Sequence, residues 1–369
     1  MKNKRIIVSG GGTGGHIFPA IAIANALRQL CEDVEILFVG AEGRMEMEKV
    51  PAAGYRIVGL PVVGVERKAL SRKNLSAPVK MLKSLRKAAA LISDFAPAVV
   101  VGVGGYASAP TLWVAQNRRI PTLVQEQNSY AGVTNKLLAR RARKVCVAYE
   151  GMERFFPAEK IVFTGNPVRQ DLCGVAQLRG EALAHFGLSQ NKKTVLVVGG
   201  SLGARTLNLS VLHHIADIAA ARDVQLIWQT GEAYRQHIQS RLAGREPGNV
   251  KVMSFIGRMD YAYAAADVVI SRAGASAIAE LCVAEKPCIL VPSPNVAEDH
   301  QTSNARALES RRAALLVPDV EAVQRLVPTA MQLLGNEAER QELALNIGRL
   351  ALPDAAERIA QETLKLMNN

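Results

Sequence analysis

The sequence is poor in aromatic residues and contains no paired cysteine motif. Phenylalanine, tyrosine and tryptophan make up 5% of the 369 residues, and the five cysteines form no Cys-x-x-Cys pair. An odd number of scattered cysteines does not make a disulfide framework. We therefore expect reduced core thiols, as in a cytosolic protein.

The sequence also lacks an uninterrupted apolar run long enough for a membrane span. The uncharged stretch 95–116 is broken by three glycines and two prolines. We interpret it as a buried parallel strand over 98–102, a glycine turn and a helix from about Ala109, because a spanning helix needs about 20 consecutive apolar residues. The N-terminal run Ile6–Val8 is too short for the apolar core of a signal peptide.

Two motifs of nucleotide-binding proteins are missing. No Gly-Lys-Ser/Thr follows either glycine-rich loop, which excludes a P-loop, and no Asp-x-Asp occurs that could clamp a metal on a diphosphate. A Gly-x-Gly-x-x-Gly spacing is present at Gly10, Gly12 and Gly15. The acidic residue that a dinucleotide site requires comes late, at Glu42, so this class is disfavoured.

What the chain does contain is a glycine-rich loop in each half. Gly10–His16 follows the strand-like run Arg5–Ser9, and Gly199–Ala204 follows Thr194–Val198, with 189 residues between the loop starts. A strand, a glycine loop and a helix together direct backbone N–H groups at an anion. Since 369 residues exceed one ordinary core, two similar domains are expected.

Strand-like and helical patterns alternate through both halves, which predicts an α/β fold with doubly wound parallel sheets and ligands beyond the carboxyl ends of the strands. The further expected elements are Pro19–Leu30, Val34–Val39, Met45–Ala53, Val99–Val103, Pro121–Val124, Leu207–Ala221, Gln225–Gln229, Val250–Ser254, Val268–Ser271, Ala275–Val283 and Cys288–Val291. The predicted domains are 1–167, completed by a C-terminal helix at 353–369, and 168–352. A hinge is expected near Gly165-Asn166-Pro167, and a linker from there to about Lys192.

The net charge of +12 is concentrated in two segments of the first half. Apolar side chains alternate with the cations of the first segment, a pattern that favours an anionic membrane surface. Nucleic acid is the rival partner, but aromatic residues are sparse and no binding motif is present; a solvated basic helix face stays open as the third interpretation. The cations are Arg67, Lys68, Arg72, Lys73, Lys80, Lys83, Arg86 and Lys87, then Arg118, Arg119, Lys136, Arg140, Arg141, Arg143 and Lys144.

Several polar residues follow predicted strands and are candidates for chemistry. His16 comes directly after the first loop, and its near-neutral pKa suits a general base. Gln125–Asn128 follows a strand and is interpreted as a ligand contact, with a structural turn as the alternative. Glu280 is placed to accept ribose hydroxyls, or else is an ordinary helix acid. Arg169 and helix dipoles would offset the charge of a leaving group.

The motifs occur in one order along essentially the whole chain, and that series resembles the MurG family of N-acetylglucosaminyltransferases. The motifs are Gly11–His16, Gly104-Gly105-Tyr106, Glu126-Gln127-Asn128, Gly165–Arg169, Gly199–Ala204, Arg272–Glu280 and Asp299-His300-Gln301. The resemblance implies a GT-B fold, with two Rossmann-like domains facing across a cleft. It further implies inverting transfer of N-acetylglucosamine from its UDP donor to the muramoyl 4-hydroxyl of undecaprenyl-diphospho-N-acetylmuramoyl-pentapeptide (lipid I to lipid II), a step of peptidoglycan synthesis.

The resemblance also implies residue roles. His16 and Glu126 would be catalytic, and Gly104, Gly105 and Tyr106 would lie on the acceptor side. It implies no required cofactor and no metal ligand, and stimulation by a divalent cation stays open. It places the protein peripherally on the cytoplasmic face of the inner membrane, with cell-wall synthesis and division proteins as partners. The implied donor contacts are Thr13, Gly14, Gly15, Asn128, Arg169, Ser201, Ile256, Ala275, Ser276, Ala277, Ile278, Ala279, Glu280 and Gln301.

The sequence departs from the family pattern at two places. Gln125 stands where the family often has histidine, so proton transfer from that position would need another group. Ser276 and Ala277 stand where bulkier or hydroxylated residues are common. Two other functions stay open: a UDP-sugar epimerase or other GT-B enzyme that works without a lipid acceptor, and a non-catalytic UDP-sugar-binding membrane adaptor.

Overall fold

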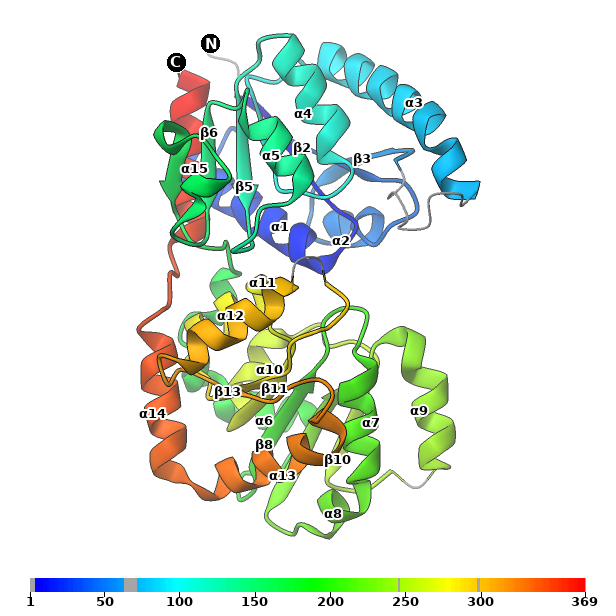
Figure 1. The fold of residues 1–369 in the computed structure, drawn as a ribbon, viewed down its shortest axis with the longest axis vertical. Coiled ribbons are helices and arrows are strands. Elements are labelled where there is room, and N and C mark those ends of the chain that lie inside the picture. The colour runs from blue at the N-terminus through cyan, green and yellow to red at the C-terminus, as the bar shows by residue number, and fades with distance from the viewer. Residues whose placement is uncertain (1–3, 63–71, 245, 297–298, 369) are drawn as a thin grey trace. The chain divides into compact units, whose positions relative to one another are not determined.

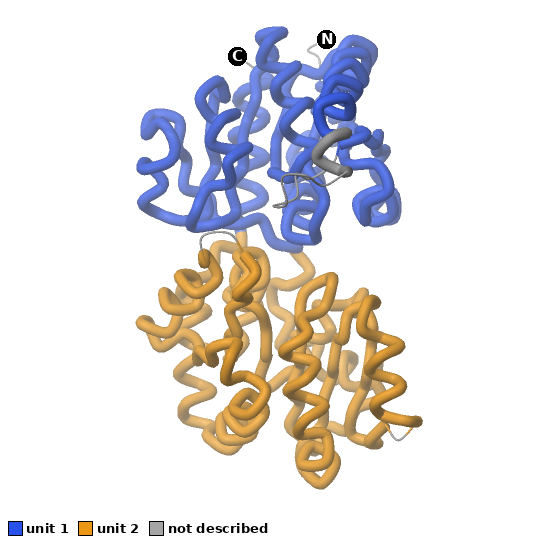
Figure 2. Tube along the Cα trace, turned by 45° about the vertical axis from the view of Figure 1, so that its right-hand side comes forward, with its two compact units in different colours: residues 1–169, 354–369 blue, residues 170–353 orange. Residues whose placement is uncertain are grey.

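The computed structural model describes residues 4–62, 72–244, 246–296 and 299–368, and the chain divides into two compact units (Figures 1 and 2). Unit 1 comprises Met1–Arg169 and Asp354–Asn369, and unit 2 comprises Gln170–Pro353. Each unit holds one wholly parallel sheet with helices on both faces. The predicted α/β class is therefore confirmed.

Unit 1 contains a seven-stranded sheet with the order β3-β2-β1-β4-β5-β6-β7. The strands are β1 (Arg5–Ser9), β2 (Glu35–Ala41), β3 (Arg56–Leu60), β4 (Val99–Gly102), β5 (Thr122–Glu126), β6 (Lys144–Val147) and β7 (Ile161–Phe163). The helices are α1 (Gly14–Leu30), α2 (Glu46–Ala52), α3 (Arg72–Phe95), α4 (Ser108–Asn117), α5 (Val133–Ala139) and α15 (Ala355–Asn368).

The β-branched run of β1 is buried on both faces, as a central parallel strand requires. Ile6 and Val8 pack with α1, α2 and α15, whereas Ile7 packs with α3, α4 and α5 (Figure 1). The C-terminal helix α15 belongs to this unit because Ile359 and its neighbours are buried in the same cluster as Ile6.

Unit 2 contains a six-stranded sheet with the order β10-β9-β8-β11-β12-β13. The strands are β8 (Lys193–Val198), β9 (Val224–Gln229), β10 (Val250–Met253), β11 (Val268–Ser271), β12 (Cys288–Leu290) and β13 (Leu315–Leu316). The helices are α6 (Arg179–Phe186), α7 (Arg205–His213), α8 (Ile215–Ala220), α9 (Arg235–Leu242), α10 (Met259–Ala265), α11 (Ala275–Val283), α12 (His300–Glu309), α13 (Ala322–Gly335) and α14 (Glu337–Gly348).

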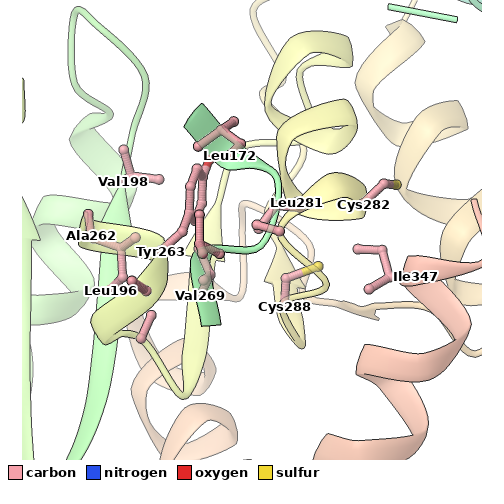
Figure 3. Packing of buried hydrophobic residues seen from close by; sticks show 14 of the residues in the cluster. Leu172, Leu196, Val198, Ala262, Tyr263, Val269, Leu281, Cys282, Cys288 and Ile347 are labelled. Atoms are coloured by element: carbon pink, nitrogen blue, oxygen red, sulfur yellow. The ribbon is translucent and has the colours of Figure 1, made fainter. Parts of the chain in front are cut away.

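The central strand β8 also alternates between two apolar layers. Leu196 and Val198 pack with α6, α10 and α11 in the cluster of Figure 3, and Val195 and Val197 pack with α7 and α13 on the other face. The fully buried Tyr263 of α10 stands among these side chains, which places its ring in the core of unit 2 (Figure 3).

Two expectations about local structure were wrong. The segment expected to be a linker contains α6, and Leu172, Leu183 and Phe186 bury their side chains in the core of unit 2. The single helix expected over Leu207–Ala221 is two helices, α7 and α8, separated by His214, whose ring Nδ1 lies 3.0 Å from Asp217 Oδ2. Apolar spacing alone does not reveal such a break, because both helices keep one face on the core.

The interpretation of 95–116 as a strand and a helix is confirmed by β4 and α4. Within the part of the chain that the structure describes, no helix combines the length and the apolar character needed to cross a bilayer. Residues 63–71 carry Arg67 and Lys68 of the first basic segment and lie outside the described residues, as does Glu298.

Candidate functional site

The loops of unit 1 that follow β1, β4 and β5 lie side by side at one edge of the sheet, because β4 pairs with both β1 and β5. Gly104 and Gly105 have positive φ angles of 91° and 81°. A Cβ atom on Gly105 would clash with the Gly11 carbonyl oxygen, so the two glycine turns pack backbone against backbone. This edge therefore admits only glycine where the turns meet.

His16 lies in the first turn of α1 and is half-buried as a residue. Its Nδ1 atom is 3.1 Å from Thr13 Oγ1. A Cβ atom on Gly104 would lie 2.9 Å from His16 Nε2, so the glycine at 104 makes room for the imidazole. Burial lowers the pKa of His16, while the carboxylate of Glu46 and a hydrogen bond with the Gly11 backbone act in the opposite direction. A lowered pKa favours the neutral ring, the form that a general base requires.

Glu46 is a residue of this edge that the sequence did not identify. It is 1% exposed, and both carboxylate oxygens accept from the Gly12 N–H at 3.0 Å, while the Ala41 N–H donates to Oε1 at 2.9 Å. A carboxylate of the chain itself therefore occupies the Gly12 N–H of the first glycine loop. Nothing distinguishes Glu46 in the sequence from Glu42 or Glu48.

Glu126 ends β5 and is also 1% exposed. Its Oε1 accepts from the backbone N–H of Asn128 at 3.0 Å, and its Oε2 accepts from the Gly132 N–H at 3.1 Å and from Asn135 Nδ2 at 2.9 Å. The carboxylate thus holds the loop between β5 and α5 in place. This arrangement supports a positioning role for Glu126 rather than the expected direct part in catalysis.

Gln125, the departure from the family pattern, is fully buried in an amide network. Its Oε1 accepts from Gln127 Nε2, its Nε2 lies 3.3 Å from Asn166 Oδ1, and Asn166 Nδ2 donates to the Gln127 carbonyl at 2.9 Å. Gln127 Nε2 also donates to the Val103 carbonyl. For Gln125 and Gln127 the structural alternative to ligand contact therefore holds, while Asn128 at the end of the segment is partly exposed.

The remaining expected residues of unit 1 lie along the same edge. Thr13 and Gly15 are exposed, Gly14 is buried, and Tyr106 is 52% exposed. Arg169 is the last residue of the segment Met1–Arg169 of unit 1. Its guanidinium lies 5.8 Å from the ring centroid of Phe18, and Phe18 follows His16 by two residues. The structure therefore brings Thr13, His16 and Arg169 to one region of unit 1.

The second glycine loop is closed by contacts with the loop after β9. Gly203 and Gly231 have φ angles of 76° and 83°, and a Cβ atom on Gly231 would lie 2.6 Å from the Cα of Gly203. Gln229, also missed from the sequence, is 3% exposed and donates from Nε2 to the Gly200 carbonyl at 2.9 Å. Ser201 at the tip of this loop stays partly exposed.

Glu280 lies on α11 and is oriented by a buried tyrosine. The hydroxyl of Tyr263 donates to Glu280 Oε2 at 3.0 Å, and Tyr263 itself is 1% exposed. Ile256 packs in the same core cluster as Tyr263, so its side chain faces inward. The expected donor contacts from Ala275 to Ala279 occupy the first turns of α11. The N-terminus of that helix is the positive end of its dipole.

Gln301 and Arg272 flank the start of α11. Gln301 Oε1 accepts from the Ser293 N–H at 2.9 Å, and its Nε2 would lie 4.0 Å from a Cβ on Gly274, so the amide group points to the helix start. Arg272 is paired with Asp319 at 2.5 Å and donates to two backbone carbonyls, which makes it a structural residue. Among the residues described, no three His, Cys, Asp or Glu side chains form a group that could hold a metal ion.

Comparisons with known proteins agree on one family. Residues 6–147 match the glycosyltransferase family 28 N-terminal domain, and residues 194–359 match the glycosyltransferase family 28 C-terminal domain. A curated protein of Parabacteroides distasonis is 58% identical over 368 residues, which is 100% of both chains. That relative is named UDP-N-acetylglucosamine--N-acetylmuramyl-(pentapeptide) pyrophosphoryl-undecaprenol N-acetylglucosamine transferase.

Two solved structures place the fold. MurG of Acinetobacter baumannii is 30% identical with a TM-score of 0.71, covering 98% of this chain and 99% of that one. A UDP-GlcNAc 2-epimerase of Neisseria meningitidis has a TM-score of 0.69 and covers 98% of this chain and 100% of that one, but it is only 14% identical, so it shares the fold alone. The GT-B fold expected from the resemblance is confirmed.

The Tyr263–Glu280 pair generates a prediction about nucleotide binding. If Glu280 accepts ribose hydroxyls, Glu280→Ala will weaken UDP binding by about 10-fold or more, since hydrogen bonds to a charged group contribute about 1.5–3 kcal/mol. Isothermal titration calorimetry measures the change, with exposed Glu309→Ala as the matched control. Unchanged UDP affinity in Glu280→Ala would remove Glu280 from the nucleotide site.

Proposed function

The chain belongs to glycosyltransferase family 28, and we propose that it transfers N-acetylglucosamine from UDP-N-acetylglucosamine to undecaprenyl-diphospho-N-acetylmuramoyl-pentapeptide. The observation that carries this function is the 58% identity, over the whole length of both chains, to a transferase named for that reaction. The new bond forms at the muramoyl 4-hydroxyl and converts lipid I to lipid II in peptidoglycan synthesis.

Unit 2 is proposed as the donor-binding domain. Its glycine loop after β8 leads into α7, and α11 begins at the same edge of the sheet, so two positive helix ends are available for the diphosphate of UDP. Glu280 would bind the ribose. The side-chain amide of Gln301 would donate a hydrogen bond to UDP-N-acetylglucosamine near the start of α11. Gln229 donates a hydrogen bond to the Gly200 carbonyl of this loop. Its side chain is uncharged and therefore does not repel a diphosphate.

Unit 1 is proposed to bind the acceptor and to remove its proton. His16 takes the proton of the muramoyl hydroxyl, and the oxygen attacks the anomeric carbon in a single displacement. The bond from that carbon to the UDP oxygen breaks, and UDP leaves with the electron pair. Glu126 acts as a positioning residue that fixes the loop carrying Asn128, while Gly104, Gly105 and Tyr106 lie on the acceptor side.

A membrane surface on unit 1 is proposed to bring the enzyme to its lipid substrate. On α3, Val79, Met81 and Leu82 are 59%, 42% and 50% exposed, and Lys80, Lys83 and Arg86 stand between and after them. Arg118 at the end of α4 donates to Ser93 of α3 at 2.8 Å, which joins the two helices. Apolar side chains among cations suit an anionic leaflet. We accordingly place the protein peripherally on the cytoplasmic face of the inner membrane.

The function is tested by release of UDP from UDP-N-acetylglucosamine, with and without a short-chain analogue of the lipid-linked muramoyl-pentapeptide. We expect release only with the analogue, together with a new disaccharide product. Sugar conversion without the analogue would instead support an epimerase, and donor binding without turnover would support a membrane adaptor. Either result contradicts the proposal.

The role of His16 predicts a specific loss of turnover. His16→Ala should lower kcat by about 100-fold or more, the scale of a general base, while UDP binding to unit 2 stays unchanged. Steady-state kinetics with the lipid analogue and calorimetry with UDP measure the two effects. A kcat close to that of the unmodified protein would exclude His16 as the base.

The membrane surface predicts a selective loss of vesicle binding. Replacing Lys80, Lys83 and Arg86 by glutamine should weaken binding to phosphatidylglycerol vesicles roughly 100-fold, since each cation near the surface contributes about 1 kcal/mol. The matched control replaces Lys193, Arg222 and Arg241, three exposed cations of unit 2. Equal losses in both triple variants, measured by vesicle sedimentation, would show general charge attraction and refute the assigned surface.

A further inference from the structure

The carboxylate of Glu46 is buried in unit 1, next to the first glycine loop. Besides accepting hydrogen bonds from the N–H groups of Gly12 and Ala41, this side chain requires glycine at two neighbouring positions. A Cβ on Gly40 would lie 2.6 Å from Glu46 Cγ, and a Cβ on Gly11 would overlap the carboxylate. The glycine-rich loop, β2 and the start of α2 are thus shaped to enclose one negative charge.

The Glu46 carboxylate is bound to the backbone of the glycine loop that leads to His16, the proposed base. His16 follows Gly12 by four residues, and its hydroxyl partner Thr13 is the next residue after the N–H that Glu46 binds. The loop after β4 contributes the Gly104 backbone to the surroundings of the imidazole, and the first loop contributes the Gly11 backbone. Burial lowers the pKa of His16, and the negative charge of Glu46 raises it.

We propose that Glu46 is a positioning residue for the transfer: it anchors the His16 loop and stabilises the imidazolium that forms when His16 accepts the hydroxyl proton. This inference rests on the proposed function. When the acceptor O–H bond breaks and the imidazole N–H bond forms, the ring gains a positive charge in a partly buried place. A fixed carboxylate offsets the cost of that charge, and the proton later leaves to solvent.

The decisive variant is Glu46→Gln, which keeps the side-chain volume and one acceptor oxygen for the Gly12 and Ala41 N–H groups but removes the charge. Glu48→Gln is the matched control, because Glu48 lies on the same helix with its side chain 78% exposed. The pKa of His16 is measured directly by NMR titration, and its signal is assigned among the six histidines with His16→Gln.

Removing the charge should lower the pKa of His16 by roughly half to one unit, because an opposite charge nearby stabilises the protonated ring. The acid limb of the kcat/KM profile should move to lower pH by the same amount, and the plateau of kcat should fall several-fold because the base is weaker. Glu46→Asp keeps the charge and should restore most of the His16 pKa.

A rate loss at every pH with an unmoved His16 pKa would overturn the proposal and leave Glu46 a purely structural residue. An unchanged pKa and an unchanged rate would overturn it as well. If the unmodified protein shows no acceptor-dependent UDP release, the proposed function fails instead, while the NMR titration still decides whether Glu46 acts on His16.

Discussion

The hydrogen bonds between the Glu46 carboxylate and the backbone of the first glycine loop are the constraint on which the edge of unit 1 depends. A buried carboxylate is stable only when its oxygens are satisfied, and here the N–H groups of Gly12 and Ala41 satisfy them. Those bonds require glycine at 11 and 40, fix the path of the loop and thereby place His16 at the start of α1.

The two glycine loops look alike in the sequence but are supported by different chemistry. A negative carboxylate supports the loop of unit 1, whereas the neutral amide of Gln229 supports the loop of unit 2 through the Gly200 carbonyl. The neutral support leaves the loop of unit 2 suited to the anionic donor proposed for it, and Glu280 of the same unit is held by Tyr263. This difference in charge is the physical contrast between the two loops.

Much of the fold could be predicted from the sequence, because its elements are encoded in local patterns. β1, β11 and α11 begin and end at the predicted residues, since β-branched runs and glycine turns mark their limits. The break at His214 and the helix α6 were missed, because both are decided by packing against the core. The position of His16 followed from its place after a glycine loop. Glu46, Tyr263 and the buried network of Gln125 could not be predicted, because their partners are distant in the sequence.

The proposed reaction is a single displacement at the anomeric carbon, with one base and no covalent sugar intermediate. The measurement that tests it most directly is the anomeric configuration of the product, read by NMR from the coupling of the transferred sugar's anomeric proton. Because the donor sugar is linked to UDP in the α configuration, a single displacement gives a β-linked N-acetylglucosamine on the muramoyl residue. An α-linked product would contradict it and would require a second displacement.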